Sequence, residues 1–138
     1  MAWDVSLFKF SKRYSNASEI AADEQLGSLG SLSEVQSTIS EVFPHTDWTD
    51  PHWGVFSSEL GSIEFNVGKT DPADSVALHV RADDAIVEGI LALCERLGCQ
   101  ALDASDGNFL EQSAEPQRNL RKWRQYRDQI VSAGRTLD

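Results

Sequence analysis

Hydrophobic and polar residues alternate along two short stretches of the chain, which is the spacing of β-strands. Residues 62–67 and 76–81 follow this alternation, and their apolar positions are Ile63, Phe65, Val67, Val76, Leu78 and Val80. An antiparallel register that aligns Phe65 with Leu78 gives one apolar face, which helices must cover. Three further strands are predicted, at residues 3–10, 53–57 and 99–104, whereas residues 45–52 are predicted to form a polar loop.

Helical spacing of apolar residues predicts the covering helices. Ser31 and Glu34 have the spacing of a capping box at the start of one helix, which Pro44 ends. A second helix carries an apolar stripe from Ile86 to Leu97, with Asp83 or Asp84 as its cap and Gly98 as its stop. A short helix is predicted around residues 18–25, and a basic amphipathic helix over residues 118–131.

This order of elements predicts an α+β class. We expect a mostly antiparallel sheet of about five strands with two helices packed on one face, plus the C-terminal basic amphipathic helix. The arrangement is similar to ferredoxin-like topologies with an added strand. The predicted organisation is an α+β sandwich domain at residues 1–114 and a C-terminal helical extension at residues 115–138.

Charge divides the chain at the same place. The 138 residues have a formal net charge of -10. Residues 1–114 hold 6 Lys and Arg against 19 Asp and Glu, a net charge of -13, whereas residues 115–138 hold 6 against 3, a net charge of +3. An acidic surface repels phosphate backbones and attracts basic proteins, so we expect a basic protein partner and no nucleic acid.

Several other classes are disfavoured by the sequence. No stretch approaches the ~18 apolar residues of a membrane span, and no secretory signal is recognisable, so we expect no membrane partner and a cytoplasmic location. Cys94 and Cys99 are expected to be two buried free thiols, because no C-x-x-C motif is present. The chain has neither a G-x-S-x-G elbow nor a phosphate-binding loop after a strand, so we expect no catalytic residue and no cofactor.

Two groups of residues could nevertheless carry chemistry. The predicted register places Glu64, His79 and Arg81 on the sheet face opposite the apolar one, where a carboxylate beside an imidazole could perform acid-base catalysis or bind a ligand. A solvated ion pair is the favoured interpretation. His45, Asp47, Asp50 and His52 could bind a metal, but their crowding around Pro51 favours a turn with Asp caps and no metal site.

The basic C-terminal extension has three interpretations. It could fold back on the acidic body, bind an anionic membrane or nucleic acid, or dock to a partner. The charge of the body favours self-docking or exchange between two copies, so a homodimer through residues 116–138 is one expectation. A structural or assembly role with a swapped helix follows from the same feature.

A series of short motifs resembles a known group of proteins. The motifs are Trp53-Gly54, residues 62–68 (Ser-Ile-Glu-Phe-Asn-Val-Gly), residues 78–81 (Leu-His-Val-Arg) and residues 101–103 (Ala-Leu-Asp). They are similar to those of a family of small uncharacterised bacterial proteins over residues 1–111, which implies a bacterial cytosolic origin and a shared sandwich fold. The size, acidity and class of the chain also resemble those of immunity proteins, which neutralise bacterial toxins by covering their active sites.

Together these features predict a non-enzymatic protein-binding module, an immunity or inhibitor protein with an acidic contact surface. Trp48 or Trp53 could anchor the partner, although Trp53 is the one expected to lie in the core. The predicted partner-binding residues are Asp47, Trp48, Asp50, Glu59, Asp71, Asp74, Asp83 and Asp84. The alternative is a small enzyme or ligand-binding protein that uses Glu64, His79 and Arg81.

Overall fold

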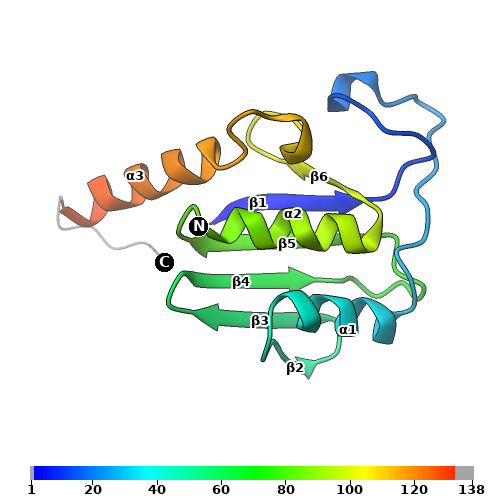
Figure 1. The fold of residues 1–138 in the computed structure, drawn as a ribbon, viewed down its shortest axis with the longest axis horizontal. Coiled ribbons are helices and arrows are strands. Elements are labelled where there is room, and N and C mark those ends of the chain that lie inside the picture. Colours follow the sequence, from blue (N-terminus) through cyan, green and yellow to red (C-terminus); the bar gives the residue numbers. More distant parts are fainter. Residues whose placement is uncertain (1, 133–138) are drawn as a thin grey trace.

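Six antiparallel strands form one sheet in a computed structural model, which describes residues 2–132 (Figure 1). Their order across the sheet is β2-β3-β4-β5-β1-β6. The strands are β1 (Trp3–Phe8), β2 (Asp47–Asp50), β3 (Trp53–Ser58), β4 (Gly61–Asn66), β5 (Ser75–Ala82) and β6 (Gln100–Asp103). The α+β class is confirmed, and the sheet contains one strand more than the alternation of residues predicts.

The register between β4 and β5 is the predicted one. Phe65 pairs with Leu78, Ile63 with Val80 and Glu64 with His79. β1 lies between β5 and β6 and is antiparallel to both, so β5 and β6 run parallel to each other on either side of it. The segment from β5 through the following helix to β6 is therefore a split β-α-β unit, the feature shared with ferredoxin-like folds.

Strand β2 lies where a polar loop was predicted. Asp47 pairs with Val55 and Asp50 with Trp53, with an irregularity between the two pairs. The Trp48 ring covers Gly54 of β3 so closely that a Cβ atom at Gly54 would lie 2.7 Å from it. The polar composition of β2 is tolerated because the strand sits at the edge of the sheet, where only one face needs to be apolar.

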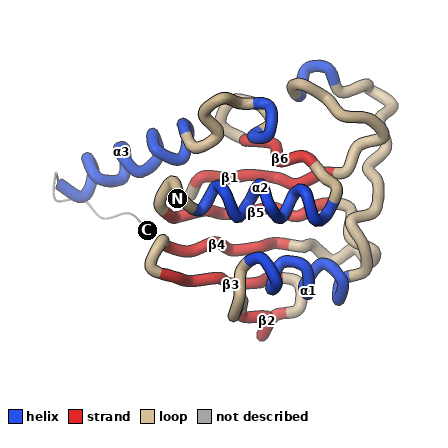
Figure 2. The backbone as a smooth tube through the Cα atoms, viewed as in Figure 1, coloured by secondary structure: helices blue, strands red, loops and turns tan. Residues whose placement is uncertain are grey.

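Helices α1 (Leu32–Val42) and α2 (Ile86–Leu97) lie over the same face of the sheet (Figures 1 and 2). The capping box at Ser31 and Glu34 is present, as the sequence predicts. The predicted Asp cap of α2 is wrong: the N-cap is Ala85, without a side-chain bond, and the Asp83 carboxylate accepts the N–H of Asp84 instead. The helix begins with two backbone hydrogen bonds. The N–H of Ile86 donates to the carbonyl of Asp83, and the N–H of Val87 donates to the carbonyl of Asp84.

The core lies between these helices and the sheet. Its central side chains are less than 2% exposed, which buries the apolar face of the sheet completely. The largest of them are Trp3, Phe65, Leu7, Ile39, Ile63, Leu78, Ile90, Leu93 and Leu120.

Helix α3 (Arg118–Ser132) matches the helix predicted over residues 118–131, and residues 133–138 of the predicted C-terminal extension lie outside the described part. Its first turn is docked, because Leu120 is fully buried and Trp123 packs against the core. The helix then runs away from the sheet (Figure 1), leaving Tyr126 51% and Val131 59% exposed. Two 3₁₀ turns complete the fold, η1 (Ala17–Glu19) and η2 (Leu110–Gln112), and η1 replaces the helix predicted around residues 18–25.

The docking of α3 can be tested at Leu120. We expect Leu120→Ala to lower the free energy of unfolding by about 2–4 kcal/mol, because it leaves a cavity in the core. The matched control, Val131→Ala on the exposed end of the same helix, should change it by less than about 0.5 kcal/mol. Chemical denaturation followed by tryptophan fluorescence measures both values. Equal effects of the two substitutions would show that α3 is not docked through Leu120.

Candidate functional site

The face of the sheet opposite α1 and α2 is exposed and carries a mixed polar and aromatic surface. The side chains of Asp4, Arg81 and His79 are 55%, 41% and 30% exposed, and Val55 is 39% exposed. Residues paired across antiparallel strands share a face, so the pairings of β2 with β3 place Asp47 and Asp50 beside Val55 and Trp53. We call this surface the open face; it comprises Asp4, Asp47, Asp50, Trp53, Val55, Glu64, His79 and Arg81.

The three residues predicted as an alternative site lie together on the open face, but they form two separate pairs. The Arg81 guanidinium donates to the Glu64 carboxylate over 2.9 Å. His79 Nδ1 lies 2.7 Å from a carboxylate oxygen of Asp4, on the neighbouring strand β1. Asp4 therefore orients the imidazole, the role that sequence reasoning gave to Glu64. The β1–β5 pairing could not be read from local alternation, so Asp4 was missed.

The two candidate tryptophans have exchanged the roles expected of them. Trp48 packs against the core, and its Nε1 donates to the Ser40 hydroxyl of α1 over 2.9 Å. Trp53 lies on the open face, where its ring stacks on His79 with the ring centroids 5.6 Å apart. The expectation that Trp53 belongs to the core is therefore wrong, because Trp53 has the same strand parity as Glu64 and His79.

Asp47 and Asp50 are fixed in orientation by local hydrogen bonds. One Asp47 oxygen accepts the N–H and the hydroxyl of Thr49, and these bonds lower the pKa of Asp47 below its ordinary value. Asp50 accepts the N–H of His52 in the same way. Both carboxylates are exposed and form no ion pair with any residue between 2 and 132. Local hydrogen bonds therefore hold both carboxylates in fixed orientations.

The other predicted acidic residues do not join this surface. Asp71 and Asp74 lie in the loop between β4 and β5, where Asp71 accepts the N–H of Leu32 at the start of α1. Glu59 lies in the β3–β4 hairpin at the opposite end of the strands, and the Leu60 carbonyl there accepts the N–H of Asp83. Six-residue strands separate these two groups by roughly 20 Å.

Asp84 forms ion pairs with the C-terminal helix. Arg121 donates to it over 2.9 Å, and Arg124 pairs with its other oxygen. Partial burial raises the pKa of Asp84, but the hydrogen bonds and charges of the two arginines outweigh this effect and lower it. The described part of the basic extension thus folds back on the acidic body of its own chain, as one of the three interpretations predicts.

The loop considered for a metal contains no such arrangement. His52 Nδ1 lies 2.5 Å from the Gly68 carbonyl, and His45 adopts a left-handed backbone conformation beside Pro44. Within residues 2–132, no group of three or more His, Cys, Asp and Glu side chains is placed to hold a metal ion. None of the helices in this range is long and apolar enough to cross a membrane.

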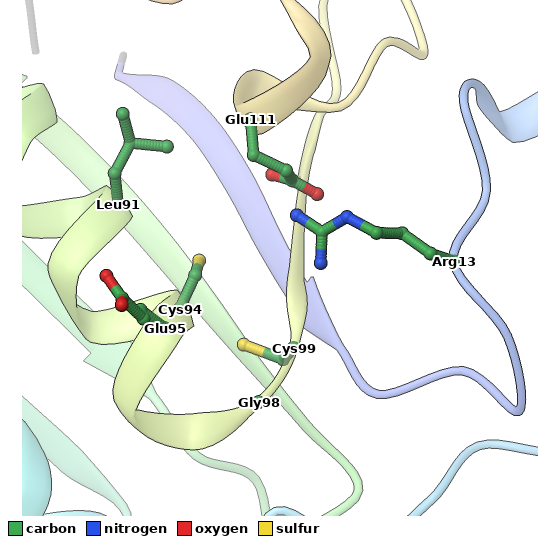
Figure 3. A pocket seen from close by; sticks show the side chains of 7 residues that line it. All are labelled: Arg13, Leu91, Cys94, Glu95, Gly98, Cys99 and Glu111. Atoms are coloured by element: carbon green, nitrogen blue, oxygen red, sulfur yellow. The ribbon is translucent and has the colours of Figure 1, made fainter.

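A cavity of about 450 Å³ lies on the helix side of the sheet, beside α2 and β6 (Figure 3). Cys94 and Cys99 form part of its wall together with Arg13, Glu95 and Glu111. The contact with the Cys99 thiol, followed by burial, raises the pKa of Cys94. Beyond the two cysteines, no sequence pattern indicates this site, because Arg13 comes from the loop after β1 and Glu111 from η2, far apart in the chain.

Comparisons with protein-family models, with curated proteins and with solved structures found no match. The function proposed for this chain therefore depends on its own residues and geometry.

The ion pairs of Asp84 predict a specific dependence on pH. The folded pKa of Asp84 is depressed, so its contribution is fully present above the unfolded value of about 3.9 and is lost as the pH falls through the folded value. The difference in free energy of unfolding between wild type and Asp84→Asn should be about 1 kcal/mol at pH 6 and should shrink towards pH 2. Urea denaturation at each pH measures it, and a difference that stays constant with pH would contradict this assignment.

Proposed function

We propose that this chain is a non-enzymatic binding module for a basic protein, and that the open face is its contact surface. One observation carries the proposal: Trp53 and Val55, two partly exposed apolar side chains, lie on an exposed sheet face beside Asp47 and Asp50, whose carboxylates form no ion pair within residues 2–132. Tryptophan is enriched among the residues that dominate binding energies, and surrounding charges steer the partner.

The rigidity of this surface supports the same function. Trp53 is held by its stack on His79, which Asp4 orients in turn, and Glu64 is held by Arg81. Side chains that are already ordered lose little conformational entropy when a partner binds. The acidic field of the body adds to the association rate, and its screening by salt predicts weaker binding at high ionic strength.

The finer proposal is an immunity or inhibitor protein that neutralises a bacterial toxin in the cytoplasm. Its support is the combination of small size, a net charge of -10 and a partly exposed aromatic anchor, Trp53. Toxins that attack nucleic acids bind a polyanion, and this binding favours a basic surface. An acidic module with an aromatic anchor is suited to cover such a surface.

The alternative of a small enzyme or ligand-binding protein has weaker support. Its residues, Glu64, His79 and Arg81, lie on the open face, and none of them lines the cavity of about 450 Å³. Glu64 and His79 are each engaged by a different partner, Arg81 and Asp4. Acid-base catalysis needs a group within hydrogen-bond reach of a bound substrate, and a flat face does not enclose one.

Co-expression with its genomic neighbours tests the proposal. The product of each adjacent reading frame is expressed alone and together with this chain, and cell growth is followed. We expect one basic product to be toxic and this chain to relieve the toxicity. The result that no adjacent product is toxic, together with the failure of any basic protein to bind the chain at physiological salt, would overturn the proposal.

Variants of the open face then locate the contact surface. Trp53→Ala should weaken binding at least tenfold, and the double substitution Asp47→Asn with Asp50→Asn should slow association and flatten its salt dependence. The matched control is Glu19→Gln with Glu88→Gln, which removes the same charge from exposed positions outside the open face. Surface plasmon resonance at two salt concentrations measures all three. Equal behaviour of the two double variants would show that the open face is not the contact surface.

A further inference from the structure

Cys94 and Cys99 share one cavity with three charged side chains, and the protein-binding proposal makes no use of this site (Figure 3). We propose that this cavity is a thiol-disulfide exchange site for small zwitterionic disulfides of the cystine type. Cys94 and Cys99 are the exchanging pair, and the charged side chains recognise the ends of the ligand. The cavity shares no residue with the open face.

The backbone holds the two cysteines together at the end of α2. Gly98 has a φ of 65°, the left-handed conformation that ends a helix, and its N–H donates to the Glu95 carbonyl. The N–H of Cys99 then donates to the Cys94 carbonyl over 3.0 Å. A disulfide needs Cα atoms about 4.4–6.8 Å apart, a span that this single-turn bond can satisfy.

Both buried thiols line this cavity, and Cys99 also lines a smaller neighbouring hollow. Cys94 is 4% and Cys99 is 5% exposed, yet both line a space of about 450 Å³. This volume lies in the range of small-molecule sites. Figure 3 shows both sulfur atoms in the region between α2 and the neighbouring chain segments. A disulfide that enters the cavity therefore meets both cysteines at once.

The charged side chains of the cavity match a ligand with both an ammonium and a carboxylate group. Arg13 lines the cavity and forms no ion pair with any residue of the described part of the chain. Glu111 accepts the N–H of Ala101 with one oxygen, while its Oε1 is buried without a partner. A guanidinium binds a carboxylate, and an unpaired carboxylate oxygen needs a donor such as an ammonium group.

The exchange proceeds in two balanced steps. Cys99 loses its proton to solvent, and its thiolate attacks a ligand sulfur; the ligand S–S bond breaks, half of the ligand leaves as a thiolate, and a mixed disulfide forms. This step removes the Cys99 thiol, whose contact is the main cause that raises the pKa of Cys94. Cys94 then loses its proton to solvent, attacks the Cys99 sulfur and releases the other half of the ligand. The protein dithiol is oxidised to a Cys94–Cys99 disulfide, and the ligand disulfide is reduced to two thiols.

Intact-mass spectrometry of the full chain tests the proposal. On incubation with cystine at pH 8, we expect the native chain to lose the mass of two hydrogen atoms and to keep no adduct. Cys94→Ser and Cys99→Ser, each checked for native circular dichroism, should instead retain one half-cystine as a mixed disulfide. A native wild-type chain that stays unmodified while the urea-unfolded chain reacts would overturn the exchange site.

Recognition by charge has its own control. Arg13→Gln, at an exposed position that leaves the fold intact, should slow the reaction with cystine about tenfold and leave the reaction with neutral bis(2-hydroxyethyl) disulfide unchanged. Glu111→Gln keeps an oxygen for the Ala101 N–H and should show the same selectivity. Equal rates with both disulfides in wild type and variants would show that the thiols are merely accessible, and would overturn the ligand site.

Discussion

The pairing of β1 with β5 is the constraint on which the rest of the structure depends. β1 opens the chain, yet it lies between β5 and β6, which come from the second half. Its insertion completes the apolar face that α1 and α2 cover, and the same register brings Asp4 beside His79. Without β1, β6 would have no neighbouring strand in the sheet.

Local sequence patterns predicted the parts of the fold that depend on residues close together in the chain. Alternation over residues 62–67 and 76–81 was sufficient for the β4–β5 register, and the Ser31–Glu34 spacing for the start of α1. β2 was missed because its four residues are polar, and its pairing with β3 and the cover of Trp48 come from tertiary structure. The strand parity of Trp53 was misjudged for a related reason, since an aromatic residue suggests burial whichever face it occupies.

The candidate sites show the same limit more strongly. Three residues of the open face were predicted as a group because they lie on adjacent strands, but Asp4 required a contact across 75 positions in sequence. The seven predicted acidic contacts separate into groups at different ends of the sheet, and the C-terminal helix engages Asp84. Net charge indicates the sign of the charge that a partner would carry. The location of the contact depends on which carboxylates the fold leaves without an ion pair.

The short acidic strand β2 has a consequence for the protein as a solute. An edge strand offers a row of unsatisfied backbone groups on which another sheet can grow, and an exposed flat face beside it invites stacking of copies. β2 is only four residues long, carries Asp47 and Asp50 at its two ends, and is followed by Pro51. Like charges would meet wherever two such edges approached each other. The carboxylates that we propose as contacts for a basic partner would thus also keep identical molecules from joining into fibres.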